Sequence, residues 1–162
     1  QGLSMGLEMN MLNAVLSVNE AQCYQIITML EKSIGSLSDK RCLVLGLAFK
    51  PGTDDIREAV SLKIIDLLIQ RRVNVISHDP LATNNFMRTF KRSAHVDLVA
   101  DDWQSHIVNV DIIIIATAWP EYRGLLPMDI SGKIIFDARR MFHPSDFPLS
   151  QYIAIGRAVI AT

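Results

Sequence analysis

An uninterrupted apolar run, Ile112–Ala116, constrains the fold of this chain most strongly. A strand with one wet face alternates between apolar and polar residues, whereas a strand without alternation is typical of a parallel sheet covered on both faces. Similar short runs recur along the chain and are separated by segments of helical character. The sequence therefore predicts a doubly wound α/β domain, in which ligands bind at the carboxyl ends of the strands. The expected strands are 42–45, 73–77, 96–99, 110–116, 133–136 and 152–155, and the expected helices are 57–71, 83–91, near 101–106 and near 121–125.

A long helix is expected before this sheet, from about Met9 to Ile34, and Gly35 ends it. Its apolar residues lie on more than one side, which favours contact with something beyond its own domain. The alternative is an ordinary amphipathic helix packed on its own sheet. We divide the chain accordingly into residues 1–36 and a domain of residues 37–162. The main stripe is Leu12, Val15, Leu16, Cys23, Ile26, Ile27 and Leu30, and the second set is Ala14, Val18 and Ala21.

Composition excludes several classes of protein. With 49% apolar and 20% charged residues over 162 positions, the chain can form one domain with a core of ordinary size. Its net charge of −1 argues against nucleic acid or an anionic membrane as a partner. The longest apolar run is strand-sized, so we expect no membrane span, and no secretion signal is visible. Because the chain begins at Gln1 without a start-like segment, we expect it to be part of a longer protein, and because no secretion signal is visible, we expect that protein to be cytoplasmic.

Neither cysteines nor histidines supply a reactive site. Cys23 and Cys42 form no CxxC and lack a neighbouring base, so we expect reduced, inert thiols and no catalytic residue in this chain. The four histidines have no spacing typical of metal ligands, and we therefore expect no metal site.

The loop after the first strand carries the chemistry. It begins at Gly46, contains Lys50, and leads to Asp55 and Glu58, whose three-residue spacing predicts a capping box with the helix N-terminus at Asp55. Arg57 would then lie in the first turn, where the helix dipole disfavours a cation. Either one of the neighbouring acids neutralises Arg57, or it joins Lys50 and free backbone N–H groups to hold a phosphate.

The usual nicotinamide signature is absent from the sequence. No GxGxxG follows the first strand, and no GK[ST] phosphate loop is present. Asp79 follows Gly46 by 33 residues, longer than the roughly 20 of a dinucleotide fingerprint. The sequence thus predicts a Rossmann-like domain without the usual nicotinamide-binding signature.

Taken together, the segment Leu43–Ala59 and later landmarks resemble the UDP-glucose/GDP-mannose dehydrogenase family. The resemblance is to its C-terminal, UDP-binding domain, and it is strongest to the UDP-glucose 6-dehydrogenase members. The landmarks occur in the family's order and cover nearly the whole chain from about residue 10. They are Ser61-Leu62, His78-Asp79-Pro80, Ala116–Tyr122, Phe136–Arg139 and Ile155-Gly156-Arg157.

The resemblance implies roles for four residues. Phe49 and Lys50 match positions that contact the UDP-sugar, and Arg139 matches an arginine that contacts the UDP moiety. Arg57 matches an arginine that reaches the phosphates of NAD from the opposite domain. Two positions depart from the family pattern, because this chain has Ala138 for the usual glycine and Ala118 for the usual glutamate; the first puts the exact place of Arg139 in doubt, and we give the second no role.

For the complete protein, the resemblance implies an NAD-dependent oxidation of the C6 alcohol of UDP-glucose to UDP-glucuronate, for polysaccharide biosynthesis. Two NAD molecules are consumed, through a thiohemiacetal and a thioester on a cysteine that this chain lacks. The N-terminal NAD-binding and central domains would be partners in the same chain, and the opening helix would form a homodimer. Two alternatives stay open: a related enzyme acting on GDP-mannose or a UDP-N-acetylhexosamine, and a stand-alone nucleotide-binding module without chemistry.

Overall fold

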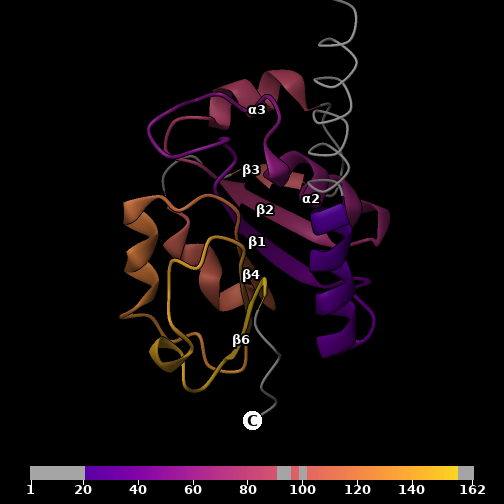
Figure 1. Cartoon of the computed structure of the whole chain (residues 1–162), viewed down its shortest axis with the longest axis vertical. Helices are drawn as coiled ribbons and strands as arrows, with labels where there is room; N and C mark the ends of the chain where they lie inside the picture. The colour runs from indigo at the N-terminus through magenta and orange to yellow at the C-terminus, as the bar shows by residue number, and fades with distance from the viewer. Residues whose placement is uncertain (1–20, 91–95, 99–101, 157–162) are drawn as a thin grey trace, which may run out of the picture.

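The computed structural model describes residues 21–90, 96–98 and 102–156. Within these ranges it is built on a single six-stranded sheet, whose strands can be followed in Figure 1. All pairs are parallel, in the order β3-β2-β1-β4-β5-β6. The order reverses between β1 and β4, so the predicted doubly wound fold is confirmed. The strands are β1 (Arg41–Leu45), β2 (Asn74–His78), β3 (Val96–Leu98), β4 (Ile112–Ile115), β5 (Ile134–Asp137) and β6 (Gln151–Ala154).

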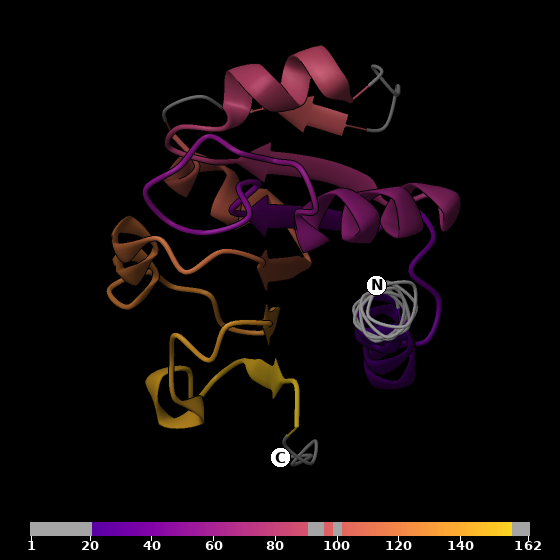
Figure 2. The same cartoon turned by 45° about the horizontal axis from the view of Figure 1, so that its top comes forward.

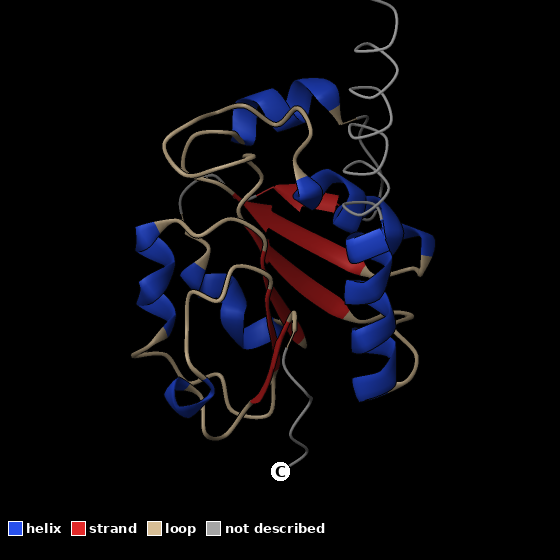
Figure 3. Ribbon diagram, in the orientation of Figure 1, coloured by secondary structure: helices blue, strands red, loops and turns tan. Residues whose placement is uncertain are grey.

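Helices flank this sheet on both sides (Figures 2 and 3). The helix of residues 21–34 and α2 (Val60–Gln70) lie on one side, and an ion pair from Arg71 Nε to Glu31 Oε1 joins them at 2.5 Å. Short 3₁₀ helices lie on the opposite side, where they cover β4, β5 and β6. The other elements are α3 (Thr83–Thr89), η1 (Gln104–Asn109), η2 (Pro120–Leu125) and η3 (Pro144–Asp146), of which η3 was not predicted.

The apolar runs fill the centre of the domain, as their lack of alternation predicted. All four residues of β4 and all four of β5 are buried, because each strand has neighbours on both sides and cover on both faces. The register brings Leu45, Ile115 and Asp137 level with one another. The loops that follow β1, β4 and β5 therefore leave the sheet together, at its carboxyl edge.

The predicted start of α2 is wrong. The helix begins at Val60 and not near Asp55, and its N-cap position, Ala59, makes no side-chain cap. Two local features prevent an earlier start. The Asp55 carboxylate accepts from the backbone N and side chain of Arg57, and Glu58 has a left-handed backbone (φ 59°). Residues 50–59 are therefore an extension of the loop after β1.

Other boundaries shift by a few residues. The segments expected as helices near 101–106 and 121–125 are the 3₁₀ helices η1 and η2. Of the opening helix, residues 21–34 are helical, while 1–20 lie outside the described residues, together with most of its second apolar set. The division at residue 36 and the homodimer stay predictions. Across the ranges the structure describes, no helix is both long and apolar enough to cross a membrane.

Candidate functional site

The four predicted site residues follow strands at the carboxyl edge of the sheet. Phe49, Lys50 and Arg57 lie in the loop between β1 and α2, and Arg139 lies two residues after β5. All four side chains are exposed. Since the ends of β1, β4 and β5 are level, the structure places these residues on one edge.

The loop after β1 starts against the first residues of the loop after β4. Gly46 has a φ of +96°, and a Cβ atom there would lie 2.4 Å from Thr117 Cβ and 2.6 Å from Thr117 N. Only glycine allows this approach of two chain segments. The Thr117 hydroxyl then donates to the carbonyl of Ala48 at 2.6 Å, and Ser61 donates to the carbonyl of Leu47 at 2.8 Å. The first residues of the loop are thus held by the neighbouring strand and by α2.

Asp79, directly after β2, is the most heavily bonded carboxylate at this edge. Its Oδ2 accepts from the backbone N–H groups of Leu47 (2.7 Å) and Ala48 (2.9 Å) and from Trp119 Nε1 (3.0 Å). Its Oδ1 accepts from the N–H groups of Leu81 (2.9 Å) and Ala82 (2.8 Å). In dinucleotide-binding sheets an acid in this region accepts from the ribose of the cofactor. Here Asp79 is 1% exposed, and both of its carboxylate oxygens already accept hydrogen bonds from the protein's own donors.

Arg57 is paired with Asp55. Its Nε lies 3.0 Å from Asp55 Oδ1 and its Nη2 lies 2.8 Å from Oδ2. These bonds hold the pKa of Asp55 at about 2, below its usual 3.8. The geometry matches the interpretation in which a neighbouring acid neutralises Arg57. The Arg57 side chain is nevertheless 86% exposed, so water and salt screen the pair and an anionic ligand can reach it.

Of the three cations among the predicted site residues, Lys50 and Arg139 keep donors without a partner in the described part of the chain. Within the described part of the chain, Lys50 Nζ has no hydrogen bond or ion pair. Arg139 is anchored from behind, because its Nε donates to the carbonyl of Ala116 at 2.6 Å and its backbone N donates to Asp137 Oδ1 at 3.0 Å. Its Nη1 and Nη2 have no partner among those same residues. A guanidinium fixed in this way presents a planar pair of donors to a phosphate, a ribose or a uracil edge.

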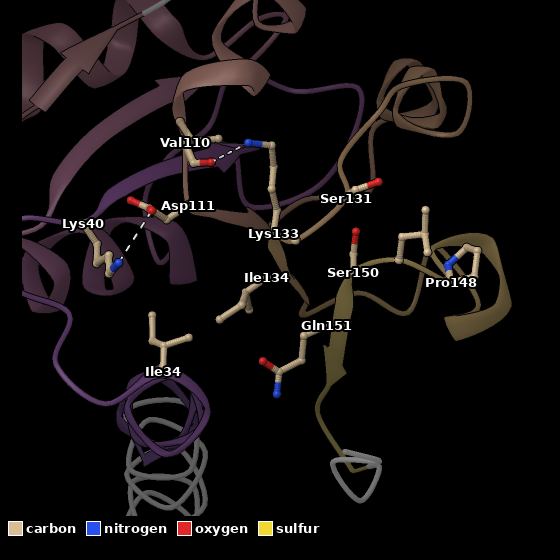
Figure 4. A pocket seen from close by; sticks show the side chains of 12 residues that line it. Ile34, Lys40, Val110, Asp111, Ser131, Lys133, Ile134, Pro148, Ser150 and Gln151 are labelled. Carbon is tan, nitrogen blue, oxygen red and sulfur yellow. Dashed lines mark hydrogen bonds and ion pairs between the residues drawn. The ribbon is translucent and has the colours of Figure 1, made fainter. Parts of the chain in front are cut away.

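Two hollows, at opposite edges of the sheet, are candidates for the binding site. One, of about 380 Å³, lies at the carboxyl edge and is lined by Phe49, Asp55, Arg57 and Glu58. A larger one, of about 530 Å³, lies at the opposite, amino edge of β4, β5 and β6 (Figure 4). Its two lysines are already engaged: Lys133 Nζ donates to the carbonyl of Val110 at 2.8 Å, and Lys40 Nζ lies 3.7 Å from Asp111 Oδ1. Since ligands of doubly wound sheets bind at the carboxyl edge, we assign the site to the smaller hollow and the loops beside it.

Comparison with known proteins identifies the family of this domain. Residues 43–144 match the UDP-binding domain of the UDP-glucose/GDP-mannose dehydrogenase family. The chain belongs to this family. The match begins in β1 and ends just after the loop that carries Arg139, so all four predicted site residues lie within the UDP-binding domain.

Individual relatives agree with this assignment. The UDP-glucose 6-dehydrogenase AglM of Haloferax volcanii is 35% identical over 84% of this chain and 31% of its own length. TuaD of Bacillus subtilis, also a UDP-glucose 6-dehydrogenase, is 30% identical over 97% of this chain and 35% of its own. The solved UDP-glucose dehydrogenase of Pyrobaculum islandicum is 36% identical, with a TM-score of 0.77 over 97% of this chain and 34% of that one. The chain thus spans about a third of the length of these relatives.

Sequence reasoning missed the part that Asp79 and Thr117 play in this UDP-binding domain. The sequence gives only a partial indication of the role of Asp79: an acid directly after a strand and before Pro80 suggests a cap for the helix that begins at Thr83. The bonds from Asp79 to Leu47, Ala48 and Trp119 join residues 31 to 40 positions apart and have no sequence signature. For metal ions, the described residues hold no group of three or more His, Cys, Asp or Glu able to bind one.

Proposed function

We propose that this chain is the C-terminal nucleotide-sugar-binding part of an NAD-dependent UDP-glucose 6-dehydrogenase. The observation that carries the proposal is a UDP-binding domain whose carboxyl edge presents two cations with free donors, Lys50 and Arg139. Lys50, with Phe49 beside it, contacts the sugar end of the substrate, and Arg139 contacts the UDP end. The similarity to UDP-glucose 6-dehydrogenases over most of the chain supports UDP-glucose as the sugar nucleotide.

The residues of this chain do not fit the main site of the NAD cofactor. Asp79, the acid after β2, already accepts hydrogen bonds from five of the protein's own donors, and no GxGxxG precedes it. We therefore place only Arg57 near the cofactor, as a contact to its phosphates from across the cleft between domains. Oxidation and the nucleophilic cysteine belong to the part of the protein outside this chain.

Turnover by the full-length protein tests the proposal. Purified full-length enzyme is expected to form NADH from UDP-glucose and NAD, measured by absorbance at 340 nm, with UDP-glucuronate as the product. Two nucleotide sugars serve as controls: UDP-N-acetylglucosamine differs from UDP-glucose in the C2 substituent, and GDP-mannose differs in the base and in the configuration at C2. A preference for either control over UDP-glucose, or no turnover with any of the three, would contradict the proposal.

A further inference from the structure

We propose that Asp79 and Thr117 are positioning residues that fix the place of Phe49 and Lys50, and through these two residues strengthen the binding of the nucleotide sugar. The inference rests on the proposed function for the role of Phe49 and Lys50. Asp79 and Thr117 are each 1% exposed, so neither reaches the outer surface of the edge. They can therefore affect the substrate only through the residues that they hold in place.

Asp79 acts as a junction of three loops. Its five donors come from the loop after β1, from its own loop after β2, and from Trp119 in the loop after β4. Among the described residues none of its partners is a cation. A buried carboxylate without a counter-ion costs much free energy unless N–H groups surround it, and hydrogen bonds to a charged acceptor are about twice as strong as neutral ones. This arrangement makes Asp79 a strong and directional anchor.

The anchored segment ends where the candidate site begins. Leu47 and Ala48 are held by Asp79 through their N–H groups, while Thr117 holds the carbonyl of Ala48. The next residue, Phe49, is 52% exposed, and its N–H group donates to the carbonyl of Asp55 and closes the loop. Phe49 and Lys50 therefore extend from the last pair of residues that the core fixes. A shift of Ala48 is transmitted directly to both.

The same strand end also supports Arg139. Ala116, next to Thr117, provides the carbonyl that accepts from Arg139 Nε. Thr117 and Ala116 thus connect the loop that carries Lys50 to the side chain of Arg139. This connection predicts that disturbing the Ala48–Thr117 contact weakens substrate binding while leaving the chemical step, which lies in another part of the protein, nearly unchanged.

Three variants of the full-length enzyme test the proposal. Thr117→Val keeps the shape and removes the hydroxyl, Thr117→Ser keeps the hydroxyl, and Asp79→Ala removes both acceptor oxygens. We expect Thr117→Val and Asp79→Ala to raise the KM for UDP-glucose by about tenfold, with kcat changed less than about threefold. Thr117→Ser should retain the wild-type KM. A general loss of folded structure would instead lower kcat as well as weaken substrate binding, and the hydroxyl of Thr117→Ser would then make no difference.

Hydrogen exchange measured by mass spectrometry gives a readout that needs no activity. Exchange in peptides covering 46–59 should be at least about tenfold faster in Thr117→Val and Asp79→Ala, while peptides covering β5 keep their protection. Asp137→Asn is the control: Asp137 is also a buried carboxylate, at the end of β5, and accepts from three donors, but it holds the loop of Arg139. It should leave exchange of 46–59 unchanged.

Several results would overturn the inference. These are unchanged exchange in 46–59, equal acceleration of exchange throughout the sheet, the same acceleration in Asp137→Asn, or an unchanged KM with accelerated exchange. If Asp79→Ala does not fold, Thr117→Val and its serine rescue decide alone. Absence of wild-type turnover with UDP-glucose would contradict the proposed function. The exchange result would still decide whether Asp79 and Thr117 position the loop after β1.

Discussion

Replacing Gly46 by alanine is expected to destabilise the domain more than any other change of a loop glycine at the carboxyl edge. The new Cβ would lie 2.4, 2.6 and 2.8 Å from Thr117 Cβ, N and Cα. Two of these atoms are backbone, so a side-chain rotation cannot relieve the overlap. In addition, the φ of +96° is unfavourable for any residue with a Cβ.

The magnitude follows from two contributions. A left-handed backbone costs a non-glycine residue about 1–2 kcal/mol, and overpacking a tight contact costs about 1–3 kcal/mol more. Gly52→Ala is the matched control, since Gly52 is in the same loop, has a φ of +80°, and has nothing within 4 Å of the position that an alanine methyl group would occupy. It should carry only the backbone contribution. The difference between the two variants, about 1–3 kcal/mol, corresponds to about 2–12 °C in Tm.

Thermal unfolding of the two variants beside the wild-type chain, followed by circular dichroism, measures this difference. The approach of β1 to the loop after β4 is the basis of the whole carboxyl edge. If Gly46→Ala unfolds at the same temperature as Gly52→Ala, that approach is absent in solution and the reasoning about the edge fails.

Other predictions concern charge and burial. In the full-length enzyme, Arg139→Ala should raise mainly the KM for UDP-glucose, by about ten- to a hundred-fold for the loss of about 1.5–3 kcal/mol. Arg57→Ala should raise mainly the KM for NAD. Steady-state kinetics showing the reverse, or a fall in Tm with neither KM changed, would contradict these roles. The same Arg57→Ala change should return the pKa of Asp55 from about 2 toward 3.8, measured by carbon NMR of its carboxyl group. Because the folded pKa is the lower one, the pair stabilises above pH 3.8 and this contribution is lost as the pH falls toward 2; an unchanged pKa would mean that the pair does not form. Burial, with the nearby Asp111 charge, raises the pKa of the Cys42 thiol, so Cys42 should not react with a thiol reagent until the domain unfolds, and rapid labelling of the native chain would show that the strand is accessible.

The sheet could be predicted from the sequence because burial on both faces leaves a direct mark. The run Ile112–Ala116 has no polar residue that would have to face water, and the structure buries each of its residues. Strand order was predictable only as a class, since the doubly wound arrangement follows from alternating strands and helices. The level ends of β1, β4 and β5 then place the loops of Lys50 and Arg139 at one edge.

The helix start could not be predicted, because the same residues serve two local structures. Asp55 and Glu58 have the spacing of a capping box, yet Asp55 uses its carboxylate on Arg57 and Glu58 adopts a left-handed backbone. Spacing alone does not distinguish these outcomes. The role of Asp79 was hidden for a different reason, since three of its five donors lie 31 to 40 residues away in the chain and become neighbours only when the sheet forms.

Titration of the isotopically labelled chain with UDP-glucose tests most directly which edge of the sheet binds the nucleotide sugar. Backbone amide shifts in a ¹⁵N–¹H spectrum report the contact surface even when binding is weak, and uridine added alone controls for the diphosphate. We predict the largest shifts at Phe49, Lys50 and Arg139, at the carboxyl edge. Shifts concentrated instead at residues 131–134 and 148–151, which line the hollow at the amino edge, would contradict the central claim.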